Sequence, residues 1–201
     1  MDYENARIYL ARQVRFRNSL KANIVNYQSA YNYAFEYDKT NTPGLKLSMR
    51  NWKDESSHFD AENKKEIQQI FRVRLNRMSN CQWRIKYFDT MRKLYAHIHN
   101  FNIDNAVLYF EKLKELSHEG MDINERLCDV DPNYGVEIID NETGSKTDSD
   151  KQHAYKQFCD NMMGTIKQVE ENLGRCKEFI IAKEVVQAKK NMITRKKKRK
   201  H

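Results

Sequence analysis

Proline and glycine are scarce in this chain of 201 residues, which contains only two prolines and six glycines. A sandwich or barrel of short strands needs such residues at its many turns, so their scarcity argues against an all-β fold. No stretch approaches the roughly 20 apolar residues that a membrane-spanning helix needs. The N-terminal segment MDYENARIYLARQVRFR also lacks the continuous apolar core of a secretory signal. We therefore expect an intracellular protein without a membrane span.

Residue patterns that carry catalytic or metal chemistry are absent as well. The sequence has no glycine-rich phosphate loop, no G-x-S-x-G elbow and no H-E-x-x-H pair. His97 and His99 alternate on a predicted helix, where side chains two positions apart point about 200° away from each other and cannot share a metal. None of the four cysteines belongs to a C-x-x-C pair, so we interpret them as reduced core residues: Cys81, Cys128, Cys159 and Cys176. We expect neither an enzyme nor a cofactor or metal.

The most regular pattern that is present is a heptad seam between residues 155 and 180. Apolar residues recur there with alternating spacings of four and three: Tyr155, Cys159, Met162, Ile166, Val169, Leu173, Cys176 and Ile180. So narrow a stripe has to be covered by another helix. If that helix belongs to this chain, the protein is a monomeric bundle, whereas a seam that pairs between chains makes a homodimer or docks another protein. A capping-box pattern of Ser149 and Gln152 predicts the start of the seam helix.

Further apolar periodicities predict an all-α fold, an elongated bundle of three long helices plus one short helix with coiled-coil-like packing. A helical domain would occupy residues 1–188, and a disordered basic tail would occupy residues 189–201. Within the domain the expected helices cover about residues 2–37, 59–100, 102–118 and 150–192. The helix at 59–100 is the natural partner for the seam helix.

Three segments of the domain are expected to be irregular. Pro43 should end the first helix, and residues 38–58 would then form a strap that either packs on the bundle through Trp52 or docks another protein. Gly120 should end the short helix as a C-terminal cap. The acidic segment at residues 121–149 is predicted to be irregular, with a short strand near its middle, at 136–139, and an exposed linker after it.

The net charge of +8 is concentrated at the C-terminal end. Residues 1–188 sum to zero, and no acidic residue follows them, so the whole excess comes from Lys189, Lys190, Arg195, Lys196, Lys197, Lys198, Arg199 and Lys200. Such a cluster is typical of a nuclear-import address or of a nonspecific contact with DNA or RNA phosphates, and a merely solubilising tail is the alternative. Arginines of two predicted helices form a second candidate basic surface: Arg12, Arg15, Arg72, Arg74, Arg77 and Arg84. Those of the first helix either bind phosphates or belong to a solvated face on which their stems cover apolar surface. Those of the second helix either bind a polyanion or pair with the acidic segment.

Two functional hypotheses follow from this charge pattern. In the first, the protein is a nuclear helical interaction or scaffold subunit of a chromatin or RNA-associated complex. It would dock a protein partner through the seam, and its tail would provide nuclear import and nonspecific nucleic-acid contact. In the second, it is a cytoskeletal or spindle adaptor with a coiled-coil body, and its basic tail binds the acidic tails of tubulin.

Overall fold

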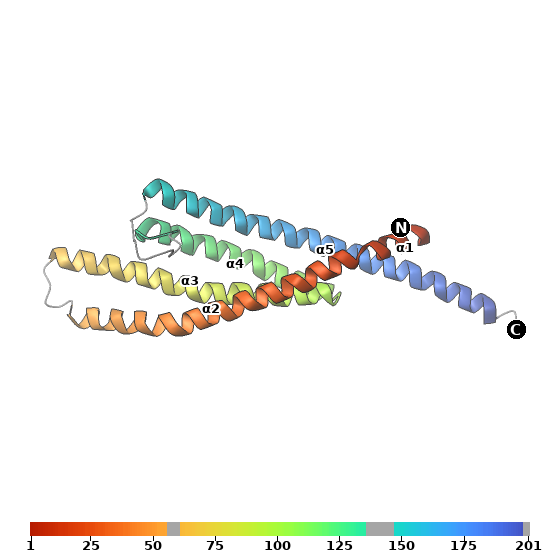
Figure 1. The fold of residues 1–201 in the computed structure, drawn as a ribbon, viewed down its shortest axis with the longest axis horizontal. Coiled ribbons are helices and arrows are strands. Elements are labelled where there is room, and N and C mark those ends of the chain that lie inside the picture. Colours follow the sequence, from red (N-terminus) through yellow and green to blue (C-terminus); the bar gives the residue numbers. More distant parts are fainter. Residues whose placement is uncertain (56–60, 136–146, 199–201) are drawn as a thin grey trace.

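A computed structural model describes residues 1–55, 61–135 and 147–198 of the chain (Figure 1). In these ranges the protein forms five helices and no strand, which confirms the predicted all-α class. The helices are α1 (Tyr3–Arg12), α2 (Val14–Glu55), α3 (Ala61–His99), α4 (Ile103–Val130) and α5 (Asp148–Lys198). Helices α2 to α5 lie side by side in an elongated bundle, and the distal part of α5 projects beyond it past α1 (Figure 1).

The first predicted helix is divided in two at Gln13. This residue caps α1 with its backbone N–H, which donates to the carbonyl of Leu10 at 3.2 Å, and its backbone leaves the helical region. Because of this break, α1 packs against α5 while α2 runs along α3. The interruption therefore lets the N-terminal segment contact two parts of the bundle.

Helix α2 does not end at Pro43, so the predicted strap is wrong over its described part. The helix continues through Pro43 to Glu55. A proline inside a helix removes one backbone hydrogen bond and costs about 3 kcal/mol. Packing of α2 along α3, the most extensive helix pair in the protein, offsets this cost. The side chain of Trp52, the predicted anchor, lies outside the described residues.

Helix α4 does not end at Gly120 either, and residues 121–130, which were predicted to be irregular, continue it to Val130. Gly120 is buried in the helix interior, where Trp83 of α3 occupies the space that a side chain would need. The indole Nε1–H of Trp83 donates to the carbonyl of Leu116 at 2.6 Å. Gly120 is thus a close-packing position and not a helix cap. The predicted strand at 136–139 lies outside the described residues.

Helix α5 begins two residues earlier than its predicted cap implies. Thr147 accepts a hydrogen bond from the backbone N–H of Asp150 at 3.2 Å, and the Asp150 carboxylate accepts from the N–H of Thr147 at 3.2 Å. The reciprocal capping box therefore uses Thr147 and Asp150, and the predicted pair of Ser149 and Gln152 is wrong. Acidic residues in the first turn, Asp148 and Asp150, complement the helix dipole.

The C-terminal end of α5 corrects a further prediction. The helix was expected to end near residue 192, and the chain was expected to be disordered from there on. Instead, α5 extends to Lys198. Lysine and arginine are good helix formers, and their charge is favourable at a helix C-terminus, so the basic run prolongs the helix. Residues 199–201 lie outside the described part of the chain.

The heptad seam is covered within the chain. Met162, Val169, Leu173 and Cys176 are buried in the core. The other seam residues are partly buried: Tyr155, Cys159, Ile166 and Ile180. Helix α5 packs mainly against α4 and α1, whereas α3, its predicted partner, packs mainly against α2 and α4. Of the two arrangements left open by the sequence, the structure shows the one in which helices of a single chain cover the seam.

Candidate polyanion-binding site

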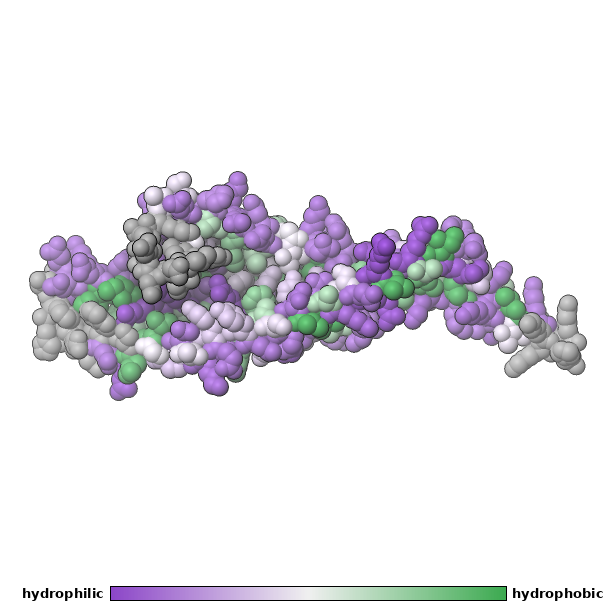
Figure 2. Space-filling model, in the orientation of Figure 1, coloured by the Kyte–Doolittle hydropathy of each residue, from purple (hydrophilic) through white to green (hydrophobic). Residues whose placement is uncertain are grey.

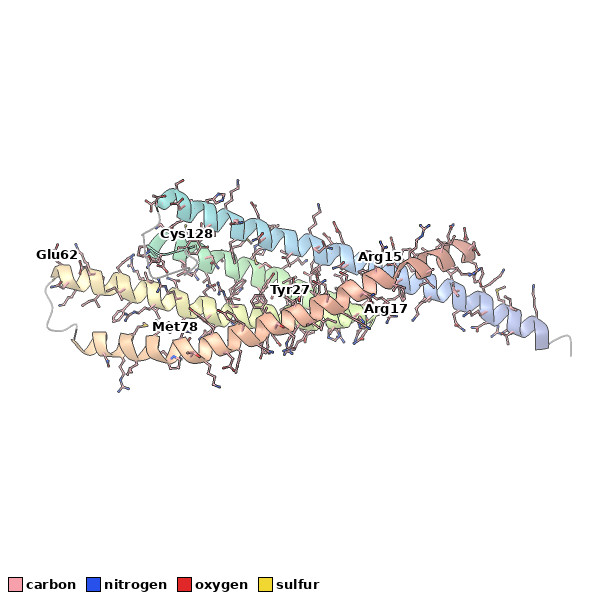
Figure 3. All side chains as sticks on the ribbon, in the orientation of Figure 1. Arg15, Arg17, Tyr27, Glu62, Met78 and Cys128 are labelled. Atoms are coloured by element: carbon pink, nitrogen blue, oxygen red, sulfur yellow. The ribbon has the colours of Figure 1, made fainter. Side chains whose placement is uncertain are left out.

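Basic side chains from both ends of the sequence meet at the narrow end of the molecule. Residues 1–21 and 173–198 contain fourteen basic and four acidic residues, and we call these two ranges the basic end. Helix α1 lies against α5 there, and Arg15 and Arg17 lie where the start of α2 crosses α5 (Figure 3). In a surface view, hydrophilic side chains dominate this narrow end and surround small apolar patches (Figure 2). The fold therefore places the arginines of the first predicted helix beside the middle of α5, and the predicted basic tail continues the same helix beyond them (Figure 1).

Small residues and one tyrosine fix α1 on α5. Ala6 and Ala182 are completely buried in the structure, and small side chains allow two helices to approach closely. The hydroxyl of Tyr9 donates to the backbone carbonyl of Arg175 at 3.1 Å. Burial, together with the nearby Glu178 carboxylate, raises the pKa of Tyr9 to about 12. The hydroxyl thus stays protonated at neutral pH and continues to donate.

Several cations of the basic end lie over the faces of aromatic rings. The rings of Phe101 and Phe179 stack with centroids 4.2 Å apart and an angle of 4°. Lys183 Nζ lies 5.4 Å from the centroid of each ring, and the guanidinium carbon of Arg17 lies 5.7 Å from the Phe101 ring. The guanidinium carbon of Arg175 lies 4.1 Å from the Phe16 ring. Such cation–π contacts orient the charged groups while leaving them hydrated.

Phe101 reaches this position through an unusual backbone conformation. It has a φ of 57°, in the left-handed region, at the turn between α3 and α4. A bulky residue rarely adopts this conformation, which costs on the order of 1–3 kcal/mol. Stacking on Phe179 and the two nearby cations offset part of this cost. The α3–α4 turn is thereby attached to the middle of α5, at the base of the basic end.

The predicted tail residues form the outer part of the basic end. The exposed helical positions include Lys189, Lys190, Arg195 and Lys196. Lys197 and Lys198 continue the helical backbone, whereas Arg199 and Lys200 lie outside the described residues. With a rise of about 1.5 Å per residue, the ten positions from 189 to 198 extend about 15 Å. The exposed cations of this stretch therefore lie on a continuous helix that projects from the bundle.

The structure divides the predicted second basic surface. Arg12 and Arg15 are exposed at the basic end. The others lie on α3, toward the opposite end of the bundle: Arg72, Arg74, Arg77 and Arg84. Arg77 pairs with Asp131 through two hydrogen bonds of 2.7 and 2.9 Å, so the expected pairing with the acidic segment holds for this residue.

Basic residues of α5 that lie before the tail were missed by the sequence-based site prediction. Arg175, Lys177 and Lys183 are exposed beside α1. Their signal in the sequence was the surplus of lysine and arginine over acidic residues after position 172. The packing of α1 on α5, together with the contact between Phe16 of α2 and Arg175, brings them beside the arginines of the N-terminal segment.

Groups for other chemistry are poorly placed in the described part of the chain. No cluster of His, Cys, Asp and Glu among these residues is arranged to hold a metal ion, and no helix there is both long and apolar enough to cross a membrane. The four cysteines carry free thiols. Burial raises the thiol pKa of Cys81, Cys128 and Cys176, which disfavours the reactive thiolate. Protein-family models, curated proteins and solved structures were compared with this chain, and none matches it.

Proposed function

We propose that the basic end binds the phosphate backbone of nucleic acid. We further propose that the protein is a non-enzymatic helical subunit of a chromatin or RNA-associated complex in the nucleus. One observation carries the proposal: fourteen of the 36 basic residues, but only four of the 28 acidic ones, belong to the basic end. The remainder of the chain is slightly acidic, so the two parts of the molecule differ sharply in charge.

Phosphate binding by this surface would be electrostatic. Each contact between a cation and a phosphate releases condensed counterions, and the affinity consequently falls as salt rises. Cations on a helix already have an ordered backbone before binding, so less conformational entropy is lost than with a disordered tail. The proposed contacts are to the backbone, which predicts similar affinities for different base sequences.

The body of the protein would act as a scaffold in this complex. Its long helices have the lengths and the heptad seam expected of coiled-coil-like packing. Because the chain covers its own seam, a protein partner would contact the outer faces of the helices. The basic run at residues 195–200 would also serve as a nuclear-import address, and deleting it should abolish nuclear accumulation.

The test measures fluorescence anisotropy of labelled duplex DNA and single-stranded RNA with the full chain. The test variant replaces four cations of the basic end with glutamine: Lys189, Lys190, Arg195 and Lys196. The control variant makes the same number of charge changes at the opposite end of α2 and α3: Lys46, Lys64, Lys65 and Arg72. The test variant should bind much more weakly, and the control should bind like the unmodified protein. Equal losses in both variants would contradict the proposed location.

A second candidate is the cytoskeletal or spindle adaptor. The observation that favours it is the projection of distal α5 beyond the bundle, where its cations could reach an acidic peptide such as a tubulin tail (Figure 1). Co-sedimentation with microtubules distinguishes the two candidates. Binding to microtubules without affinity for nucleic acid, lost in the test variant, would favour the adaptor.

A further inference from the structure

An aromatic pocket lies between α2, α3 and α5. Its described lining residues fall between positions 27 and 165 and so lie outside the basic end. Its volume is about 530 Å³, and seven of the thirteen described residues that line it are aromatic. Ligand pockets in proteins typically have volumes of about 300–1,000 Å³ and combine apolar walls with a few polar groups. The pocket therefore has the size and the lining of a site for a small molecule.

The floor of the pocket is rigid. Trp83 and Tyr87 are buried there, with ring centroids 5.0 Å apart, and Phe158 of α5 meets Trp83 edge-on at 5.7 Å. The hydrogen bond from Trp83 to the carbonyl of Leu116 fixes the indole. On the α2 side, Tyr27 packs on Tyr95 at 5.4 Å. These contacts form the floor before any ligand arrives.

The walls leave the pocket open. Ala30 and Ala34 of α2 line it, and their small side chains leave the space that larger residues would fill. Tyr33 stands at the rim with 70% of its surface exposed. A molecule can consequently enter without displacing a buried side chain.

Arg84 is the single charged residue among the described residues that line the pocket. Its side chain is exposed, and among the residues that the structure describes no carboxylate forms an ion pair with it. Arg77, two turns earlier on the same helix, is by contrast paired with Asp131. The pocket thus combines an aromatic interior with one cation that pairs with no carboxylate of the described ranges.

We propose that this pocket binds a small apolar anion, whose rings or chain pack on the aromatic floor and whose carboxylate or sulfonate pairs with Arg84. The inference goes beyond nucleic-acid binding, because the pocket is lined by residues that do not belong to the basic end. Its failure would leave the proposed function unaffected.

The test uses two fluorescent probes with the same apolar skeleton. One is 8-anilinonaphthalene-1-sulfonate, which is anionic, and the other is N-phenyl-1-naphthylamine, which is neutral. The experiment uses the full chain carrying Trp52→Phe, so that Trp83 is the only tryptophan and the only indole energy donor. Both probes should brighten and accept energy from Trp83. Absence of energy transfer, or dissociation constants weaker than about 1 mM, would overturn the pocket.

Two variants separate the roles of the cation and of the cavity. Arg84→Gln should weaken the anionic probe about three- to fivefold, as for an exposed ion pair, and leave the neutral probe unchanged. The matched control Arg72→Gln removes an exposed cation from the same helix outside the pocket and should change neither probe. Ala30→Phe should fill the cavity and weaken both probes, with the circular dichroism spectrum confirming the fold.

Other outcomes would contradict the proposal. Equal effects of Arg84→Gln and Arg72→Gln would show that Arg84 does not select for the anion. If Ala30→Phe leaves both affinities unchanged while Lys183→Gln abolishes binding of the anionic probe, the anion binds at the basic end and the inferred site is wrong.

Discussion

Gly120→Ala should destabilise the protein, although alanine is normally the better residue inside a helix. A methyl group at position 120 would overlap the Cζ2, Cε2 and Nε1 atoms of the Trp83 indole. The indole cannot easily move, because it donates to the Leu116 carbonyl at 2.6 Å and packs against Tyr87 and Phe158. Helices α3 and α4 would therefore have to separate locally to accept the methyl group.

The expected magnitude follows from opposing effects. Replacing glycine by alanine in a helix interior stabilises it by about 1 kcal/mol. Overpacking a well-packed site costs about 1–3 kcal/mol, and losing the hydrogen bond of Trp83 would leave its buried indole N–H unsatisfied at a cost of about 1–3 kcal/mol. The free energy of unfolding should therefore decrease by about 1–5 kcal/mol.

The same substitution at Gly174 is the matched control. Gly174 lies inside α5, and no atom lies within 4 Å of the position that a Cβ would occupy. Gly174→Ala should accordingly raise the free energy of unfolding by about 0.5–1 kcal/mol. Urea unfolding followed by circular dichroism at 222 nm measures both variants. If Gly120→Ala stabilises the protein as much as Gly174→Ala, the reasoning about Trp83 is refuted.

Arg77→Ala should lower the free energy of unfolding by about 1–3 kcal/mol, because Asp131 has only 6% of its side chain exposed and would lose its cation; an unchanged urea midpoint would contradict this. Burial raises the pKa of Tyr87 and Tyr134 to about 12, so their contribution to stability is complete below the unfolded value of about 10 and is lost as pH rises toward 12. Absorbance at 295 nm during alkaline titration, together with circular dichroism, should show late, cooperative tyrosine ionisation that accompanies unfolding. Light scattering should give a mass near 24.1 kDa, since the seam is covered within one chain, whereas twice that mass would indicate a homodimer.

Local sequence patterns predicted the helical class and the buried stripe of α5. The spacing of residues such as Met162, Val169 and Leu173 is a property of a single helix and can be recognised without the fold. The stop signals at Pro43 and Gly120 were misleading, because packing against α3 overrides them. The contact of Trp83 with Gly120 and the long α2–α3 interface join residues that are far apart in the sequence, so local patterns do not predict them.

The candidate site was also predictable from the sequence only in part. The excess of charge at the C-terminal end was visible in the sequence, but the meeting of Tyr9 with Arg175 joins residues 166 positions apart. The small residues that allow this contact, Ala6 and Ala182, carry no distinctive local signal. The aromatic pocket was likewise hidden, because its lining comes from three helices.

The central claim is that the basic end binds phosphates. It is tested most directly by the salt dependence of duplex DNA binding. Each phosphate contact contributes about −0.9 to the slope of log K against log salt. Replacing Lys189, Lys190, Arg195 and Lys196 with glutamine should reduce the slope in magnitude by about 3–4, if each cation contacts one phosphate. A slope that stays unchanged in this variant, or that falls equally when Lys46, Lys64, Lys65 and Arg72 are replaced, would contradict the claim.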